Sequence, residues 1–166
     1  MVAAQVRKVN VGKRKGATMM DVPANKWIKT MAQHLKQSGK CFVPNCTELM
    51  KQSHANQLAP SNEDWYFYRC AAVLRRIYNR PGTGYTSLAK SFSMKKNNGS
   101  RPEKTIYASR GLLHWVCRSL EGVNLIAKGK QQGRVITKEG KRKADAIAFN
   151  VKTGRKDVAG KKKAKK

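Results

Sequence analysis

Acidic residues are scarce in this 166-residue sequence, which has nine Asp and Glu against 36 Lys and Arg and a formal net charge of +27. A chain this basic repels copies of itself and attracts polyanions. We therefore expect a nucleic acid as the partner, bound largely through its phosphates, and we do not expect a homo-oligomer. Composition alone leaves the choice between DNA and RNA open.

Long apolar runs are also lacking. No segment approaches the ~20 residues that a membrane span requires, and residues 1–16 lack the continuous apolar core of a signal peptide. We therefore expect no membrane association and a cytosolic or nuclear location. With 40% hydrophobic residues, three Trp, five Tyr and four Phe, the chain has enough apolar material for one folded domain rather than a disordered polycation.

Recognised catalytic and metal-binding patterns are missing as well. His34, His54 and His114 lie on separate predicted elements, and none has a Cys, Asp or Glu at a recognised spacing. The four cysteines contain no C-x2-C pair of the kind that a zinc ribbon uses, and buried free thiols are the better interpretation. The sequence thus predicts no catalytic residue, no metal site, no cofactor and no enzyme.

The chain divides into three predicted parts. Residues 1–20 form a basic arm, residues 21–151 form the folded domain, and residues 152–166 form a basic tail that ends in a lysine block. Because a lysine block cannot bury apolar area, we expect the tail to be disordered.

Helical spacing of apolar residues organises the folded part. A first helix is predicted between Pro23, which suits a first turn, and Gly39, which suits a helix end. A short second helix after Pro44 is expected to turn Leu49 and Met50 inward.

The strongest predicted helix runs from about Asn62 to Tyr78. Ser61 and Asp64 have the spacing of a capping box at its start. Its apolar residues fall on almost all sides, which indicates a central helix with other helices packed around it. The expected core residues, on this helix and on a later one, are Trp65, Phe67, Leu74, Leu112 and Val116.

Basic residues mark the C-terminal half of this central helix. Arg69, Arg76 and Arg80 fall on one side of it. The alternative interpretation is a solvated face that complements the helix dipole, but given the charge of the chain we favour a strip that faces phosphates. The turn from Gly82 to Gly84 lacks the G-K-[ST] of a nucleotide-binding loop, although glycine backbone there would let a nucleic-acid phosphate approach Arg80.

The second half of the domain predicts a winged-helix-like arrangement. Residues 88–92 indicate one or two helical turns, and the basic, Asn-rich loop 95–101 is interpreted as an insertion finger rather than a plain surface loop. A helix starts near Ser109, two short strands flank a turn at 129–133, and Thr137 caps a last helix. The sequence therefore predicts a mainly α fold, a helical bundle around a central apolar helix with a small β-hairpin wing.

Several motifs occur in the order found in one known family: Lys36-Gln37-Ser38-Gly39-Lys40, Asp64-Trp65-Tyr66-Phe67-Tyr68-Arg69, Arg80-Pro81-Gly82-Thr83-Gly84, Leu120-Glu121-Gly122 and Ile136-Thr137-x-x-Gly140. Over about residues 21–151 the chain resembles the eukaryotic and archaeal small-subunit ribosomal protein nineteen-e family. The resemblance implies a structural constituent of the small-subunit head that binds ribosomal RNA (rRNA) and neighbouring head proteins. It also implies a role in rRNA maturation and subunit assembly, with a cytoplasmic ribosomal location after nucleolar passage. Where that family usually has two consecutive Arg, this chain has His114 and Trp115.

The residues expected to contact RNA are basic positions on the central helix, the polar loop, the later helices and the wing: Arg69, Arg75, Arg76, Arg80, Lys90, Lys95, Lys96, Arg101, Arg110, Arg118, Lys128, Lys130 and Arg134. The alternative function is a winged-helix DNA-binding or chromatin-associated protein, which would present a helix with exposed Asn, Gln or Arg to base edges. The central helix is instead apolar all round with bases mainly at one end. That pattern favours binding of folded RNA by shape and phosphate contact.

Overall fold

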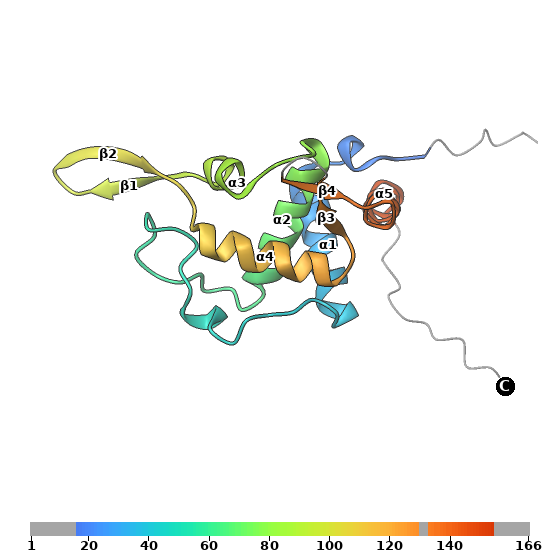
Figure 1. Cartoon of the computed structure of the whole chain (residues 1–166), viewed down its shortest axis with the longest axis horizontal. Coiled ribbons are helices and arrows are strands. Elements are labelled where there is room, and N and C mark those ends of the chain that lie inside the picture. Colours follow the sequence, from blue (N-terminus) through green and yellow to red (C-terminus); the bar gives the residue numbers. More distant parts are fainter. Residues whose placement is uncertain (1–15, 130–132, 155–166) are drawn as a thin grey trace, which may run out of the picture.

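The computed structural model describes residues 16–129 and 133–154 and has the mainly α, winged-helix-like fold that the sequence predicts (Figure 1). The elements in chain order are η1 (Met19–Asp21), α1 (Ala24–Ser38), η2 (Thr47–Leu49), α2 (Trp65–Asn79), α3 (Tyr85–Ser91), β1 (Met94–Asn98), β2 (Arg101–Ile106), α4 (Arg110–Gly122), β3 (Ile126–Lys128), β4 (Arg134–Ile136) and α5 (Lys138–Thr153). Strands β1 and β2 form one antiparallel hairpin, and β3 and β4 form a second, the wing.

Helix α2 is the central helix, and α1, α4 and β4 pack against it. Trp65 and Leu74 are buried on α2, and Leu112 and Val116 are buried on α4, whereas Phe67 is half-buried against the same core. The apolar residues of α2 point in several directions because other elements cover the helix on several sides.

The N-terminal end of the described chain belongs to the core. Met19 in η1 is fully buried, and its backbone N–H donates to the Asp145 carboxylate on α5 over 3.1 Å. Trp27 on α1 is also fully buried, and its Nε1 donates to the carbonyl of Ala144 over 3.1 Å. The packed body therefore includes Met19, which lies within the predicted arm of residues 1–20.

Two local predictions are wrong: the capping box at the start of α2 and the inward orientation of Leu49. The helix begins at Trp65, and the Asp64 carboxylate caps no backbone N–H because it accepts a 2.8 Å hydrogen bond from Lys36 Nζ on α1. Leu49 is 86% exposed rather than inward. The single 3-10 turn η2 presents only one face to the body, and Thr47 occupies that face with its hydroxyl bonded to the Pro44 carbonyl.

The start of α5 is fixed by the Thr137-x-x-Gly140 motif. Thr137 Oγ1 accepts from the Gly140 N–H over 2.9 Å and so caps the helix, as predicted. A Cβ on Gly140 would lie 2.2 Å from the carbonyl oxygen of Leu125, so only glycine lets α5 begin this close to the segment leading into β3.

The glycine turn after α2 packs on the wing. The N–H of Gly82 donates to the carbonyl of Arg134 over 2.9 Å, and the N–H of Arg134 donates to Thr83 over 3.1 Å. Gly133 has φ +85°, and a Cβ there would lie 2.1 Å from the Gly82 oxygen. The backbone of the turn therefore bonds to β4, while Arg80 beside it is exposed, and the close approach of a phosphate to Arg80 stays a prediction.

Candidate nucleic-acid interface

The predicted basic finger is a two-stranded hairpin that projects from the body (Figure 1). Every residue from Met94 to Thr105 is exposed, so neither face of β1 and β2 is covered. Lys95 and Glu103 form the one ion pair recorded within this hairpin, at 3.9 Å. A hairpin without a covered face is marginally stable in water, so we expect a partner to stabilise this element.

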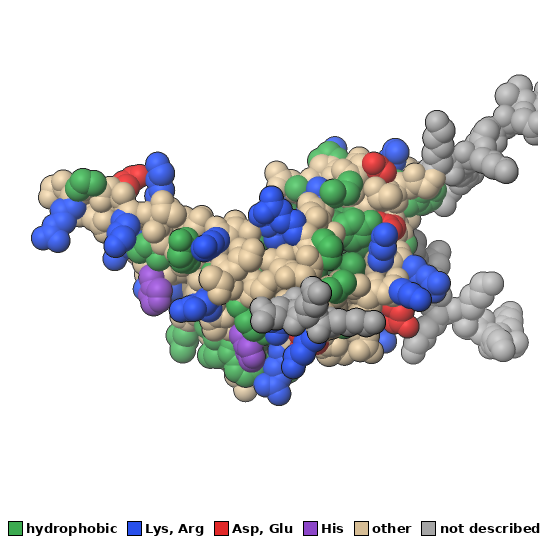
Figure 2. Space-filling model, turned by 45° about the horizontal axis from the view of Figure 1, so that its top comes forward, with side chains coloured by type: hydrophobic (Ala, Val, Ile, Leu, Met, Phe, Trp, Pro, Cys, Tyr) green, Lys and Arg blue, Asp and Glu red, His purple; other side chains and the backbone are tan. Residues whose placement is uncertain are grey.

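Sequence reasoning missed the strands and one of their cations. Lys104 on β2 is exposed opposite Lys96 and adds to the charge of the hairpin. The Asn98-Gly99 pair was an available signal, because Asn-Gly dipeptides are frequent hairpin turns, and Gly99 indeed has φ +71°. Figure 2 shows Lys and Arg side chains along the projecting hairpin and over the body, with few acidic side chains on that face.

Helix α4 continues the basic surface from the base of the hairpin (Figure 1). Arg110, His114 and Arg118 follow one another at intervals of four residues and are all exposed, so they form a stripe along the outer side of the helix. The inner side of α4, which carries Leu113 and Val116, is buried in the core. We call Arg110, His114 and Arg118 the α4 stripe.

The structure divides the predicted RNA-contacting residues into two groups. Eight of them are exposed and have side chains available to phosphates: Arg80, Lys90, Lys95, Lys96, Arg101, Arg110, Arg118 and Lys128. Lys130 lies outside the described residues. The remaining four arginines are partly buried and bound to other parts of the domain.

Arg75 and Arg134 hold pieces of the fold together. The Arg75 guanidinium donates to the Met19 carbonyl over 2.9 Å and to the Val22 carbonyl over 3.5 Å, so it ties the N-terminal segment to α2. Arg134 Nε donates to the Glu121 carboxylate over 3.1 Å, and its guanidinium lies 3.7 Å from the centre of the Tyr85 ring.

Arg69 and Arg76 contact the segments beside α2. Arg69 donates to the side-chain oxygen of Gln52 and stacks over Phe92 at 4.8 Å, and burial lowers the pKa of its guanidinium. Arg76 Nε donates to Ser91 Oγ over 2.9 Å. Arg69 and Arg76 still lie on one side of α2, as the sequence indicated, but their guanidinium groups are engaged with the protein.

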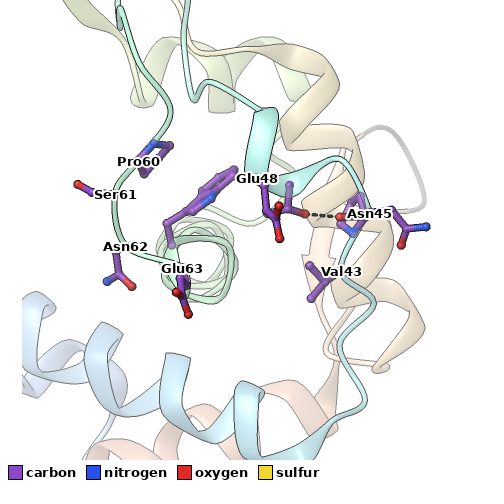
Figure 3. A pocket seen from close by; sticks show the side chains of 10 residues that line it. Val43, Asn45, Glu48, Pro60, Ser61, Asn62 and Glu63 are labelled. Carbon is purple, nitrogen blue, oxygen red and sulfur yellow. Dashed lines mark hydrogen bonds between the residues drawn. The ribbon is translucent and has the colours of Figure 1, made fainter.

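One surface has the wrong sign for RNA. The pocket drawn in Figure 3 lies between the segments 43–48 and 60–63, with Trp65 on its wall. Glu48 and Glu63 contribute carboxylates from the two segments. These carboxylates would repel a phosphate backbone, so the hairpin and α4 are the candidate interface rather than this pocket.

The described residues contain no group of three or more His, Cys, Asp or Glu that could hold a metal ion. In the same part of the chain no helix is long and apolar enough to cross a bilayer. All four cysteines are free thiols. Cys41, Cys70 and Cys117 are buried, but Cys46 is exposed, which corrects the expectation of buried thiols throughout.

A mainly helical, winged-helix-like domain with an uncovered basic hairpin and a basic helix stripe is typical of the class of nucleic-acid-binding proteins. Residues 18–154 match the family model described as ribosomal protein S19e. The chain belongs to the ribosomal protein S19e family.

Similar proteins support the same conclusion over most of the chain. The small ribosomal subunit protein eS19B of Drosophila melanogaster is 35% identical over 136 residues, which cover 82% of this chain and 88% of the relative. The small ribosomal subunit protein eS19 of Emericella nidulans is 40% identical over 134 residues, 80% of this chain and 90% of the relative. The Entamoeba histolytica eS19 is 35% identical over 135 residues, 81% of this chain and 86% of the relative.

Membership of this family confirms the resemblance seen in the sequence motifs. It also supplies the functional class: the S19e proteins are structural ribosomal proteins, and this chain is accordingly not an enzyme.

Proposed function

We propose that this chain occupies the head of the small ribosomal subunit, where it binds small-subunit rRNA and contacts neighbouring head proteins. The observation that carries the proposal is the β1–β2 hairpin, which is exposed on both faces and carries Lys95, Lys96, Arg101 and Lys104. Such an element is marginally stable alone, so a partner would stabilise it, and its charge favours a polyanion.

The binding mode that fits this geometry is recognition of folded RNA by shape and phosphate contact. The hairpin supplies cations on an extended arm, and the α4 stripe supplies Arg110 and Arg118 on the body beside it. These cations displace counterions from the RNA, which makes the affinity strongly salt-dependent. The arm enters a site in RNA that a flat protein surface does not reach.

The DNA-binding alternative places α4, the helix before the wing, in a major groove. The residues of α4 include no Asn or Gln, and the partly buried aromatic ring of Trp115 lies beside its exposed cations. Its exposed Arg110 and Arg118 could read guanine, but bidentate reading of adenine uses Asn or Gln, so α4 is equipped for only part of base-edge recognition in duplex DNA. We therefore favour rRNA as the ligand.

The location and assembly role follow from the same proposal. The chain acts in cytoplasmic ribosomes after passing through the nucleolus, takes part in maturation of small-subunit rRNA, and works as a single copy because its positive charge opposes self-association.

The test is sedimentation of the endogenous protein through a sucrose gradient. We expect co-sedimentation with small ribosomal subunits and their precursors, and accumulation of unprocessed small-subunit rRNA when the protein is depleted. Recovery solely in free or chromatin fractions at low salt would contradict the ribosomal proposal and favour the DNA-binding alternative.

A further inference from the structure

Four aromatic side chains from three segments form a continuous row across α4. The ring centroids of Phe42 and Trp115 are 6.1 Å apart, those of Trp115 and His114 are 6.3 Å apart, and those of His114 and Tyr85 are 5.5 Å apart. Phe42 comes from the loop after α1, and Tyr85 opens α3. The row is thus made by tertiary packing, and we call Phe42 and Trp115, its outer end, the aromatic platform.

The aromatic platform lies at the surface rather than in the core. Phe42 is 57% exposed, and Trp115 is half-buried, whereas Trp27 and Trp65 are buried. An open groove of about 670 Å³ beside the platform is lined by Phe42, Trp115, Arg118, Glu121 and Gly122. The volume falls within the range of small-ligand sites.

Positive charge surrounds the platform. The Arg118 guanidinium lies 5.8 Å from the centre of the Trp115 ring, and Arg110 stands two turns earlier on the same exposed stripe. The one carboxylate in the groove, that of Glu121, is already paired with Arg134 at 3.1 Å. The Arg118 guanidinium lies over the Trp115 ring, so a base that stacks there takes its place on the ring while the guanidinium moves to a phosphate.

We propose that the aromatic platform of Phe42 and Trp115 stacks on an unpaired base of rRNA, with Arg118 and Arg110 holding the flanking phosphates. The inference rests on the proposed function and adds to it a mode of recognition. The hairpin and stripe cations act on any phosphate backbone, whereas the platform accepts only a base that has left its helix.

A single-stranded partner fits better than a duplex or a protein. Bases in an RNA helix are stacked on one another and cannot present a face to Trp115. An acidic protein segment would satisfy Arg118, but it would leave the exposed Phe42 ring with water or an aliphatic contact. Base stacking uses the aromatic and cationic groups together.

The test compares two labelled RNA probes with the full-length protein: a short oligoadenylate and an abasic oligoribonucleotide with the same number of phosphates. We expect the oligoadenylate to bind about tenfold more tightly, because that ratio corresponds to the free energy of stacking one base on an aromatic side chain. We also expect oligoadenylate alone to quench the tryptophan fluorescence, because Trp115 is the tryptophan that is not buried.

Three variants test which side chains cause the preference for oligoadenylate. Phe42→Ala keeps the Trp115 reporter and changes an exposed side chain, so it folds, loses most of the preference for oligoadenylate and weakens the quenching. Arg118→Gln weakens the binding of both probes and reduces the salt dependence. Leu58→Ala, which removes an apolar side chain that is 80% exposed elsewhere, leaves both affinities unchanged.

The outcomes separate this inference from the proposed function. Equal affinities for the two probes, or an unchanged preference in Phe42→Ala, overturn stacking and leave the sedimentation result standing. If Phe42→Ala binds both probes normally but fails to enter small subunits, the platform contacts a neighbouring protein and the stacking proposal is wrong. Absence from subunits in the wild-type protein contradicts the proposed function instead.

Discussion

At the scale of single residues, arginine side chains have two different roles in this domain: some hold the fold together, and others are exposed to a partner. Arg75 on the central helix and Arg134 on the wing were both predicted to contact RNA, yet they bind carbonyl, carboxylate and ring partners inside the protein. Arg110 and Arg118 are instead exposed and accessible to a ligand. The distinction was invisible in the sequence because the partners of Arg75, Met19 and Val22, are more than fifty residues away in the chain.

Replacement of Arg75 tests its structural contact. Arg75→Ala leaves the buried Met19 and Val22 carbonyls without their donor, so we expect the free energy of unfolding to fall by about 1–3 kcal/mol. Urea denaturation followed by circular dichroism measures the change. Lys90→Ala, at an exposed position on α3, is the matched control and should stay near the wild-type midpoint. An Arg75→Ala variant of wild-type stability that binds RNA poorly would restore the original phosphate-facing interpretation.

At the scale of elements, helices were predictable and the long hairpin was not. The apolar spacing within α1, α4 and α5 is set by one buried side, so each helix could be read from its own residues. Strands β1 and β2 bury neither face, so no alternation of apolar and polar residues marks them. The wing strands were detectable because Val135 and Ile136 partly cover the core and a glycine turn separates them from β3.

Neutralising the hairpin tests the element as a binding arm. We replace four exposed cations with Gln together: Lys95, Lys96, Arg101 and Lys104. We expect weaker rRNA binding, with a slope of log affinity against log salt that is shallower by about 3, and an unchanged unfolding midpoint because these side chains contact little of the body.

The control for this variant removes the same charge from another surface. Four exposed cations on α1 and α5 are replaced with Gln instead: Lys26, Lys29, Lys138 and Arg142. Equal loss of affinity in both quadruple variants would mean that net charge, rather than the hairpin, determines binding.

At the scale of the whole molecule, the charge is arranged rather than uniform. The hairpin and the α4 stripe are adjacent and basic, while Glu48 and Glu63 line a separate pocket (Figure 3). We therefore expect a polyanion to be attracted to the hairpin and the α4 stripe and repelled from the pocket, and so to orient the domain before contact. The net charge predicts a polyanionic partner, and the placement of the charge on the fold predicts which surface that partner contacts.

Global stability should decline at alkaline pH. Burial, followed by a hydrogen bond to the Asp145 carboxylate, raises the pKa of Tyr78 to about 12. The unfolded chain then loses this proton before the folded chain does, so unfolding becomes easier as pH rises from about 10 to 12. We expect the thermal midpoint to fall through this window.

The variant Tyr78→Phe isolates this contribution. It should show a smaller decline of the midpoint between pH 10 and 12, measured by calorimetry, while Tyr107→Phe at an exposed position should decline like the wild type. A wild-type slope in Tyr78→Phe would show that other groups control the alkaline transition.

The sequence by itself determined the class of partner, the helical composition, the wing and the family, because charge, apolar period, caps and short motifs are local properties. Only the tertiary structure decided which arginines are free, that the Gly82 turn packs on the wing, and that Phe42, Trp115 and Tyr85 meet across α4. These features join residues distant in the chain, and their energies depend on burial and on distance in space. The spacing of residues along the sequence contains no information about burial or about distances in space.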